Sequence, residues 1–164
     1  MYRTLLRKIT TFTRNERGVQ LVELAIALPL MILLFAAVAE FGRYFQEYTT
    51  LAKGSRVAVR FLATARTNGL DDLQAKNLVV YGNLVGSGSP IVPGLATGNV
   101  SITRQNIAGN PVTGGLPNTV TVEIVNFKHS PLFDIGKLIN NQLSLNIDVK
   151  PSVTMRYLLT QPSL

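Results

Sequence analysis

An apolar run near the N-terminus constrains the fold of this chain more than any other feature. Residues 19–39 are apolar except for Gln20 and Glu23. At 1.5 Å per helical residue the run spans about 30 Å, the thickness of the hydrocarbon core of a bilayer. We therefore predict a membrane-spanning helix. The proline within the run does not argue against this, because membrane helices tolerate an internal proline. The predicted membrane segment includes Leu24, Pro29 and Phe35.

A carboxylate at the edge of this run needs its own explanation. Anchoring does not require Glu23, and a charge inside a membrane helix makes insertion less favourable. Gly18 lies five residues before it. The preceding segment differs from a signal peptide, because its apolar run is too long and no small-residue cleavage site follows. The alternative to a functional role is that Glu23 is solvated at headgroup level. The segment before Gly18 contains five bases: Arg3, Arg7, Lys8, Arg14 and Arg17.

The positive charge of the chain is concentrated in its first part. Lys and Arg total 16 against 9 acids, which gives a net charge of +7. Residues 1–66 contain 10 basic and 4 acidic residues, whereas residues 67–164 contain 6 and 5. Nucleic-acid recognition needs a clustered basic face on a folded domain, so we predict no nucleic-acid partner. The basic segment at the N-terminus favours a cytoplasmic N-terminus by the positive-inside rule.

Helical periodicity continues after the membrane segment. We predict one helix over residues 19–66, about 72 Å long, followed by a lobe over residues 67–164. Apolar residues at helical spacing would pack against the core of that lobe. Phe45→Asp would then unfold or detach the lobe. The stripe comprises Phe41, Phe45, Tyr48, Ala52, Val59 and Leu62.

The lobe is predicted to be α+β with a small antiparallel sheet. A second helix is expected over residues 70–85, with Asp71 and Asp72 in its first turn, where they suit the helix dipole. Residues 82–118 contain 8 Gly and 4 Pro, which is typical of loops. One strand is expected within this stretch, over residues 100–105. Ser130 is the predicted N-cap of a short helix over residues 131–139. Alternating apolar residues predict strands over residues 119–128, 143–150 and 153–157.

Residues that carry chemistry are scarce. His129 is the only histidine and there is no cysteine, so neither a zinc site nor a catalytic triad is predicted. We expect no metal, no cofactor and no enzymatic activity, and we expect His129 to be structural or solvated, with His129→Ala silent. Residues 86–90 indicate a turn-rich linker rather than a phosphate loop. Asn99 begins a glycosylation sequon, a pattern short enough to arise by chance.

The basic leader, Gly18, Glu23 and the long helix together resemble a type IV prepilin, and most closely the TadE-like minor pilins (pseudopilins) of tight-adherence systems. The first three segments named below are specific in combination and cover about a quarter of the chain. The major pilin of these systems has Glu-Tyr where this chain has Glu23 and Leu24, which favours a minor subunit. The resemblance rests on residues 14–18 (Arg-Asn-Glu-Arg-Gly), 22–29 (Val-Glu-Leu-Ala-Ile-Ala-Leu-Pro), 40–43 (Glu-Phe-Gly-Arg), 53–60 (Lys-Gly-Ser-Arg-Val-Ala-Val-Arg) and 153–156 (Val-Thr-Met-Arg).

The resemblance implies that residues 1–18 are a leader, which a prepilin peptidase removes between Gly18 and Val19. Glu23 of one subunit would then pair with the Val19 ammonium of its neighbour during pilus assembly. It further implies a single-pass protein of the bacterial inner membrane with a periplasmic lobe that becomes extracellular in the pilus. Its partners would be the peptidase, other pilin subunits and the assembly platform. Two alternatives stay open: a pseudopilin of a secretion system, or a permanently anchored periplasmic binding or scaffold module that is never cleaved.

Overall fold

The computed structural model describes residues 16–112, 115–133, 144 and 146–159. Internal contacts divide the chain into two compact units, Met1–Glu40 and Phe41–Leu164. One helix, α2 (Glu16–Thr64), contributes residues to both units and contains Pro29 without interruption. It ends at Thr64, two residues before the predicted end of the helix. In the first unit nearly every described side chain of α2 is exposed.

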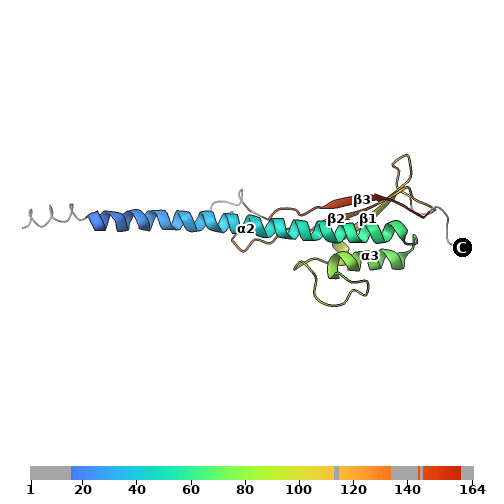
Figure 1. Cartoon of the computed structure of the whole chain (residues 1–164), viewed down its shortest axis with the longest axis horizontal. Coiled ribbons are helices and arrows are strands. Elements are labelled where there is room, and N and C mark those ends of the chain that lie inside the picture. Colours follow the sequence, from blue (N-terminus) through green and yellow to red (C-terminus); the bar gives the residue numbers. More distant parts are fainter. Residues whose placement is uncertain (1–15, 113–114, 134–143, 145, 160–164) are drawn as a thin grey trace, which may run out of the picture. The chain divides into compact units, whose positions relative to one another are not determined.

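The second unit is an α+β lobe, as predicted. It contains the C-terminal part of α2, the helix α3 (Gly69–Tyr81), the short 3₁₀ helix η1 (Thr97–Asn99) and three strands (Figure 1). The strands form one antiparallel sheet of order β1-β2-β3. Their bounds are β1 (Val100–Gln105), β2 (Thr119–Ile124) and β3 (Ser152–Arg156).

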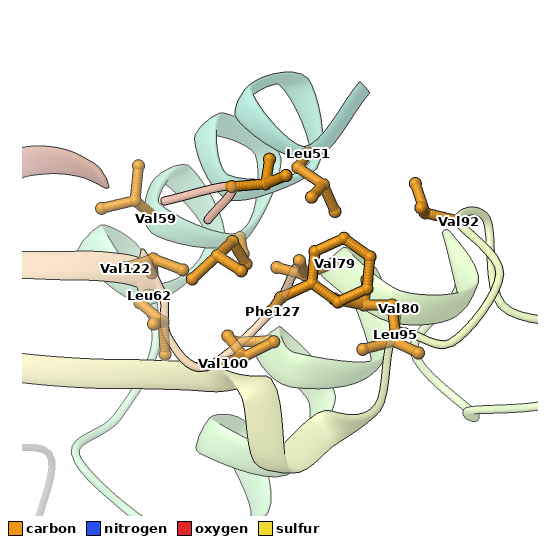
Figure 2. Packing of buried hydrophobic residues seen from close by; sticks show 14 of the residues in the cluster. Leu51, Val59, Leu62, Val79, Val80, Val92, Leu95, Val100, Val122 and Phe127 are labelled. Carbon is orange, nitrogen blue, oxygen red and sulfur yellow. The ribbon is translucent and has the colours of Figure 1, made fainter. Parts of the chain in front are cut away.

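The inner face of the sheet supplies one side of the core. Along β2, Val120, Val122 and Ile124 are buried, and the residues between them are only partly so. Val122 lies opposite Ile102 of β1 and Val153 of β3. Figure 2 shows the side chains of both helices and of the strands pointing into one cluster. The lobe is therefore a two-layer arrangement, with α2 and α3 on the same face of the sheet.

Local signals fix the ends of α3. The Asn68 side chain accepts a hydrogen bond of 2.7 Å from the Asp71 N–H, so it is the N-cap. Gly82 ends the helix at φ 71°, a left-handed conformation that glycine adopts readily, and its N–H donates to the Leu78 carbonyl. The helix therefore stops at Tyr81 rather than continuing to residue 85 as predicted, because the glycine cap precedes the last apolar residues.

A glycine allows α2 and α3 to approach closely. A Cβ on Gly54 of α2 would lie 3.4 Å from the carbonyl oxygen of Val79 in α3. An alanine would therefore be in van der Waals contact with the α3 backbone, and a larger side chain would push the helices apart.

The predicted contact stripe on α2 is wrong over its first half. Phe41 and Phe45 are 63% and 62% exposed, and Tyr48 is also exposed, whereas Val59 and Leu62 are buried as predicted. The packed face includes Ser55, which hydropathy ranks as polar, and this obscured the true periodicity. The buried residues of α2 in the lobe are Leu51, Ser55, Ala58, Val59, Leu62 and Ala63.

Two further predictions between β2 and β3 need correction. Residues 131–133 are not helical, so the predicted helix does not start after Ser130; residues 134–139 lie outside the described residues. Of the predicted strand over residues 143–150, the described residues are 144 and 146–150, and these form one bridge, between Lys128 and Asp148. Asn126 takes φ 53° between β2 and this bridge, and that turn interrupts the ladder. Val149 is buried as expected, but Ile147 is exposed.

Candidate assembly site

Gly18 lies within α2, in an environment that does not require a glycine. A Cβ added there would meet no atom within 4 Å. Its backbone has no positive φ, unlike the loop glycines. Glycine in a helix is about 0.8–1.0 kcal/mol less favourable than alanine. The packing of this chain therefore gives no reason for the residue, whereas close approach of another protein to the backbone would.

The peptide bond between Gly18 and Val19 lies on an exposed part of α2. Val19 is 65% exposed, and Gly18 is exposed as well. Because both residues lie within the helix, a protease that needs an extended substrate would have to open the helix at this bond.

Glu23 is exposed one helical turn after Val19. Its carboxylate makes no hydrogen bond or ion pair with any residue that the structure describes. Residues three and four positions away on the same helix face are Gln20, Ile26, Val19 and Ala27, none of which is a cationic side chain. Any partner of the Glu23 carboxylate must come from elsewhere.

The rest of this segment is suited to lipid. Among the described residues, one helix is long and apolar enough to cross a membrane, and its apolar part follows Gly18. Leu24 and Phe35 are 55% and 63% exposed. Pro29 lies within the continuous helix. An apolar surface of this extent, exposed all round a helix, is the pattern of a membrane anchor.

Comparison with known proteins gives one match. Residues 18–60 match the family described as TadE-like protein. Over these residues the chain is TadE-like. The match associates the chain with the tight-adherence pilus, and the anchor fits a membrane-anchored pilus protein. No curated protein and no solved structure matched the chain.

The TadE-like segment begins at the glycine of the predicted cleavage site and contains Glu23 and the whole apolar run. It ends at Arg60, four residues before the end of α2. Most of the lobe lies beyond it, so the lobe must be interpreted from its own contacts.

His129 is buried in the lobe and paired, so the prediction of a structural residue is right and that of a solvated one is wrong. It is 1% exposed, and its Nδ1 lies 2.7 Å from Oε2 of Glu47 on α2. Its ring meets Tyr44 edge-on, with centroids 5.8 Å apart. The cluster attaches the segment after β2 to α2. A buried polar group of this kind is costly to leave unpaired, so His129→Ala cannot be silent.

A second polar contact joins the sheet to α3. Arg104 of β1 binds Asp72 with both terminal guanidinium nitrogens. Nη1 donates to Oδ2 at 3.1 Å, and Nη2 donates to Oδ1. Asp72 therefore binds an arginine as well as suiting the helix dipole. The two residues are 32 positions apart, and neither lies in a motif that sequence reasoning could have used.

The C-terminal segment satisfies carbonyl groups at the end of α2. The Leu158 N–H donates to the Ala63 carbonyl at 2.9 Å, and the Tyr157 hydroxyl donates to the Ala65 carbonyl at 2.6 Å. Carbonyl groups at the C-terminal end of a helix have no N–H donor within the helix, so these bonds supply the missing donors. Burial raises the pKa of Tyr157 above its ordinary value of 10.0.

Two of the hollows in the described part of the lobe lie beside its polar contacts. One, of about 260 Å³, lies beside the His129 cluster. The other, of about 360 Å³, lies beside Arg104 and Asp72. Within the described residues, no three His, Asp or Glu side chains come together as metal ligands would. The hollow beside the His129 cluster is lined by Arg43, Gln46, Glu47, Thr50, Ile91, Val92, Pro93, Phe127 and Ser130.

Two loop segments are held by asparagine side chains. Residues 86–90 are irregular, with Gly86 and Gly88 at positive φ, as expected for a turn-rich segment. The Asn83 side chain accepts hydrogen bonds from the Gly86 and Ser87 N–H groups. Asn99 uses its side-chain amide to donate to the Val125 and Asn126 carbonyls, at 3.2 and 3.0 Å. The nitrogen that glycosylation would modify is therefore engaged in the fold.

Proposed function

We propose that this chain is a minor pilin, which a prepilin peptidase cleaves between Gly18 and Val19 and which then takes part in assembling an adhesive tight-adherence pilus. The observation that carries the proposal is the pairing of an unexplained helical glycine with an unpartnered carboxylate at the start of a TadE-like membrane helix. Anchoring alone requires neither residue.

Cleavage would create the partner that Glu23 lacks. The new N-terminus is the ammonium of Val19, four residues from Glu23. Each charge is unfavourable in an apolar environment unless it is paired. A contact between Glu23 of one subunit and the Val19 ammonium of its neighbour would neutralise both charges and set the axial register of the two helices.

The lobe, in this proposal, is a binding and assembly surface without catalytic activity. The basic leader places the N-terminus in the cytoplasm, so the lobe is periplasmic before assembly and extracellular in the pilus. Its polar clusters are explained by contacts between segments: His129 with Glu47, and Arg104 with Asp72. These contacts stabilise the lobe, and they account for its described charged pairs without a catalytic role.

The test is the intact mass of the protein extracted from membranes of its native host. We expect a chain that starts at Val19, and we expect Gly18→Leu to block the cleavage because a side chain would obstruct the peptidase. Gly42→Leu is the matched control, since Gly42 is also a helical glycine with no atom within 4 Å of an added Cβ. A native chain that keeps residues 1–18 would refute the proposal and favour a permanently anchored module.

A further inference from the structure

The helix α2 carries three exposed cations on the lobe side of the membrane segment. Lys53, Arg56 and Arg60 are all exposed, at positions i, i+3 and i+7. Residues 48–70 contain no acid at all. Side chains three and four apart on a helix are neighbours, so their like charges repel one another. The local sequence thus maintains a positive stripe without any intrahelical compensation.

These cations differ from others in the lobe. Arg104 binds Asp72 and Lys150 binds Asp148, whereas the three side chains on α2 make no hydrogen bond or ion pair with the part of the chain that the structure describes. The helix dipole does not account for them either, because its effect is confined to the last turn and no basic residue lies there.

Exposed aromatic residues lie on the adjoining side of the same helix. Phe41 and Phe45 are 63% and 62% exposed. At about 100° per residue, Arg56 lies within about 20° of Phe45 around the helix axis, and Arg60 within about 60°. Exposed aromatic and arginine side chains together are the composition that protein interfaces favour at their centres.

We propose that this basic–aromatic face, formed by Phe41, Phe45, Lys53, Arg56 and Arg60, docks an acidic surface of another protein subunit. The proposal rests on the proposed function, which supplies neighbouring subunits at high local concentration. The fitting partner presents at least two carboxylates beside an apolar side chain. Carboxylates would pair with the guanidinium groups, and the apolar side chain would cover the phenyl rings.

A second copy of this chain fits less well. Three lobe carboxylates are already occupied in the described residues: Glu47 by His129, Asp72 by Arg104 and Asp148 by Lys150. Of the described lobe carboxylates, a copy would therefore bring only Asp71 and Glu123 to the face, and these lie on different elements, α3 and β2. The phenyl rings at the N-terminal end of the face favour a protein over a nucleic acid, for which cations alone would be sufficient.

The experiment is site-directed photocrosslinking in the native host. The chain has no cysteine, so Val57→Cys, at a position 55% exposed beside the cations, accepts a single maleimide–benzophenone probe. We expect a crosslink to a peptide of a different protein that contains two or more carboxylates. Ile107→Cys, at a loop position 91% exposed, is the control site and should not give this product.

Charge reversal tests whether the crosslink depends on the three cations of the face. Lys53→Glu, Arg56→Glu and Arg60→Glu together should lower its yield about tenfold or more, as expected for a contact that depends on complementary charge. The matched control makes the same change of charge at Lys76, Lys128 and Arg156. Both triple variants must first show the wild-type thermal midpoint, and a variant that does not is replaced by the corresponding glutamine triple.

Three outcomes would overturn the docking proposal: no crosslink, a crosslink to a second copy, lipid or nucleic acid, or an equal loss of yield in both triple variants. The intact mass of the chain and its presence in pili are measured in the same cells. A chain that starts at Val19 and enters pili without the crosslink refutes the docking face alone, whereas an uncleaved chain refutes the proposed function.

Discussion

His129 joins the segment after β2 to α2 across 82 positions of sequence, through the 2.7 Å contact between its Nδ1 and Glu47 Oε2. Its neighbours along the chain reinforce the attachment, because the His129 N–H donates to the Ile147 carbonyl and the Val149 N–H to the Phe127 carbonyl, each at 2.9 Å. The His129 side chain thus ties this segment to α2, and backbone hydrogen bonds tie the same segment to residues 147–149.

Removing this side chain should destabilise the lobe. We expect His129→Ala to lower the free energy of unfolding by about 1–3 kcal/mol, because Glu47 loses its partner in a mostly buried position. Urea denaturation of the full chain in detergent micelles, followed by tyrosine fluorescence, measures the effect. The control is Lys128→Ala at the exposed neighbouring position, which should change stability by less than about 0.5 kcal/mol. Equal midpoints for both variants would contradict the structural role.

Tyr157 predicts a dependence of stability on alkaline pH. Because burial raises the pKa of its phenol in the folded protein, the unfolded chain ionises first, near pH 10.0. The stabilisation is therefore complete below that pH and is lost as pH rises through the folded pKa. Tyr157→Phe should lower stability at neutral pH by about 0.5–1.5 kcal/mol, through loss of the bond to Ala65. It should also reduce the loss of stability at alkaline pH. The free energies of unfolding of both proteins, measured between neutral pH and about pH 11, check both effects.

At the scale of elements, α2 changes its role along its length. In the first unit its surface is apolar and exposed, whereas in the lobe one face packs on α3 and the sheet (Figure 2). Gly54 allows close approach to α3, and Ala63 accepts a hydrogen bond from the C-terminal segment. The lobe is therefore built on the second half of a helix whose first half has the composition of a membrane anchor.

Two substitutions on α2 distinguish its packed face from its exposed one. Leu62→Ala should lower the free energy of unfolding by about 2–5 kcal/mol, because Leu62 is only 1% exposed and a cavity would remain. Phe45→Asp, by contrast, should leave the lobe folded, since Phe45 lies outside the core. Limited proteolysis of spheroplasts carrying each variant checks both. Degradation of the Phe45→Asp lobe would show that Phe45 contributes to the core, as the predicted stripe requires.

At the scale of the whole molecule, the two units have different requirements. The first must enter a membrane and then leave it for a filament, in the proposed function, while the second must stay folded in water. Glu23 concerns only the first of these, because it has no partner among the described residues.

We expect Glu23→Ala to separate insertion from assembly. Loss of a carboxylate favours the bilayer, so membrane insertion should be unchanged, while incorporation into pili should fall at least about tenfold because the Val19 ammonium stays unpaired. Glu23→Asp should be partly tolerated, and Gln20→Ala is the control at an exposed polar position one turn away. Carbonate extraction and immunogold counts on isolated pili give the two readouts. Normal piliation by Glu23→Ala would show that the proposed pair between subunits is wrong.

The sequence by itself determined the features that depend on neighbours along the chain. The strand predicted over residues 100–105, within the loop-rich stretch, coincides with β1, Val100–Gln105. The membrane helix followed from a long apolar run, and the start of α3 was predicted within one residue. The pattern around Gly18 and Glu23 indicated the family that residues 18–60 match. Helix and strand periods and dipole preferences act over a few residues, so a single sequence contains them.

Only the tertiary structure decided which groups meet. Phe45 is more apolar than Ser55, yet Ser55 is buried and Phe45 is exposed, because α3 and the sheet cover the other side of α2. His129 is buried because Glu47 and Tyr44 happen to face it. Such contacts depend on the relative placement of elements tens of residues apart, and the free energy that fixes this placement comes from burying the whole cluster at once rather than from any local pattern.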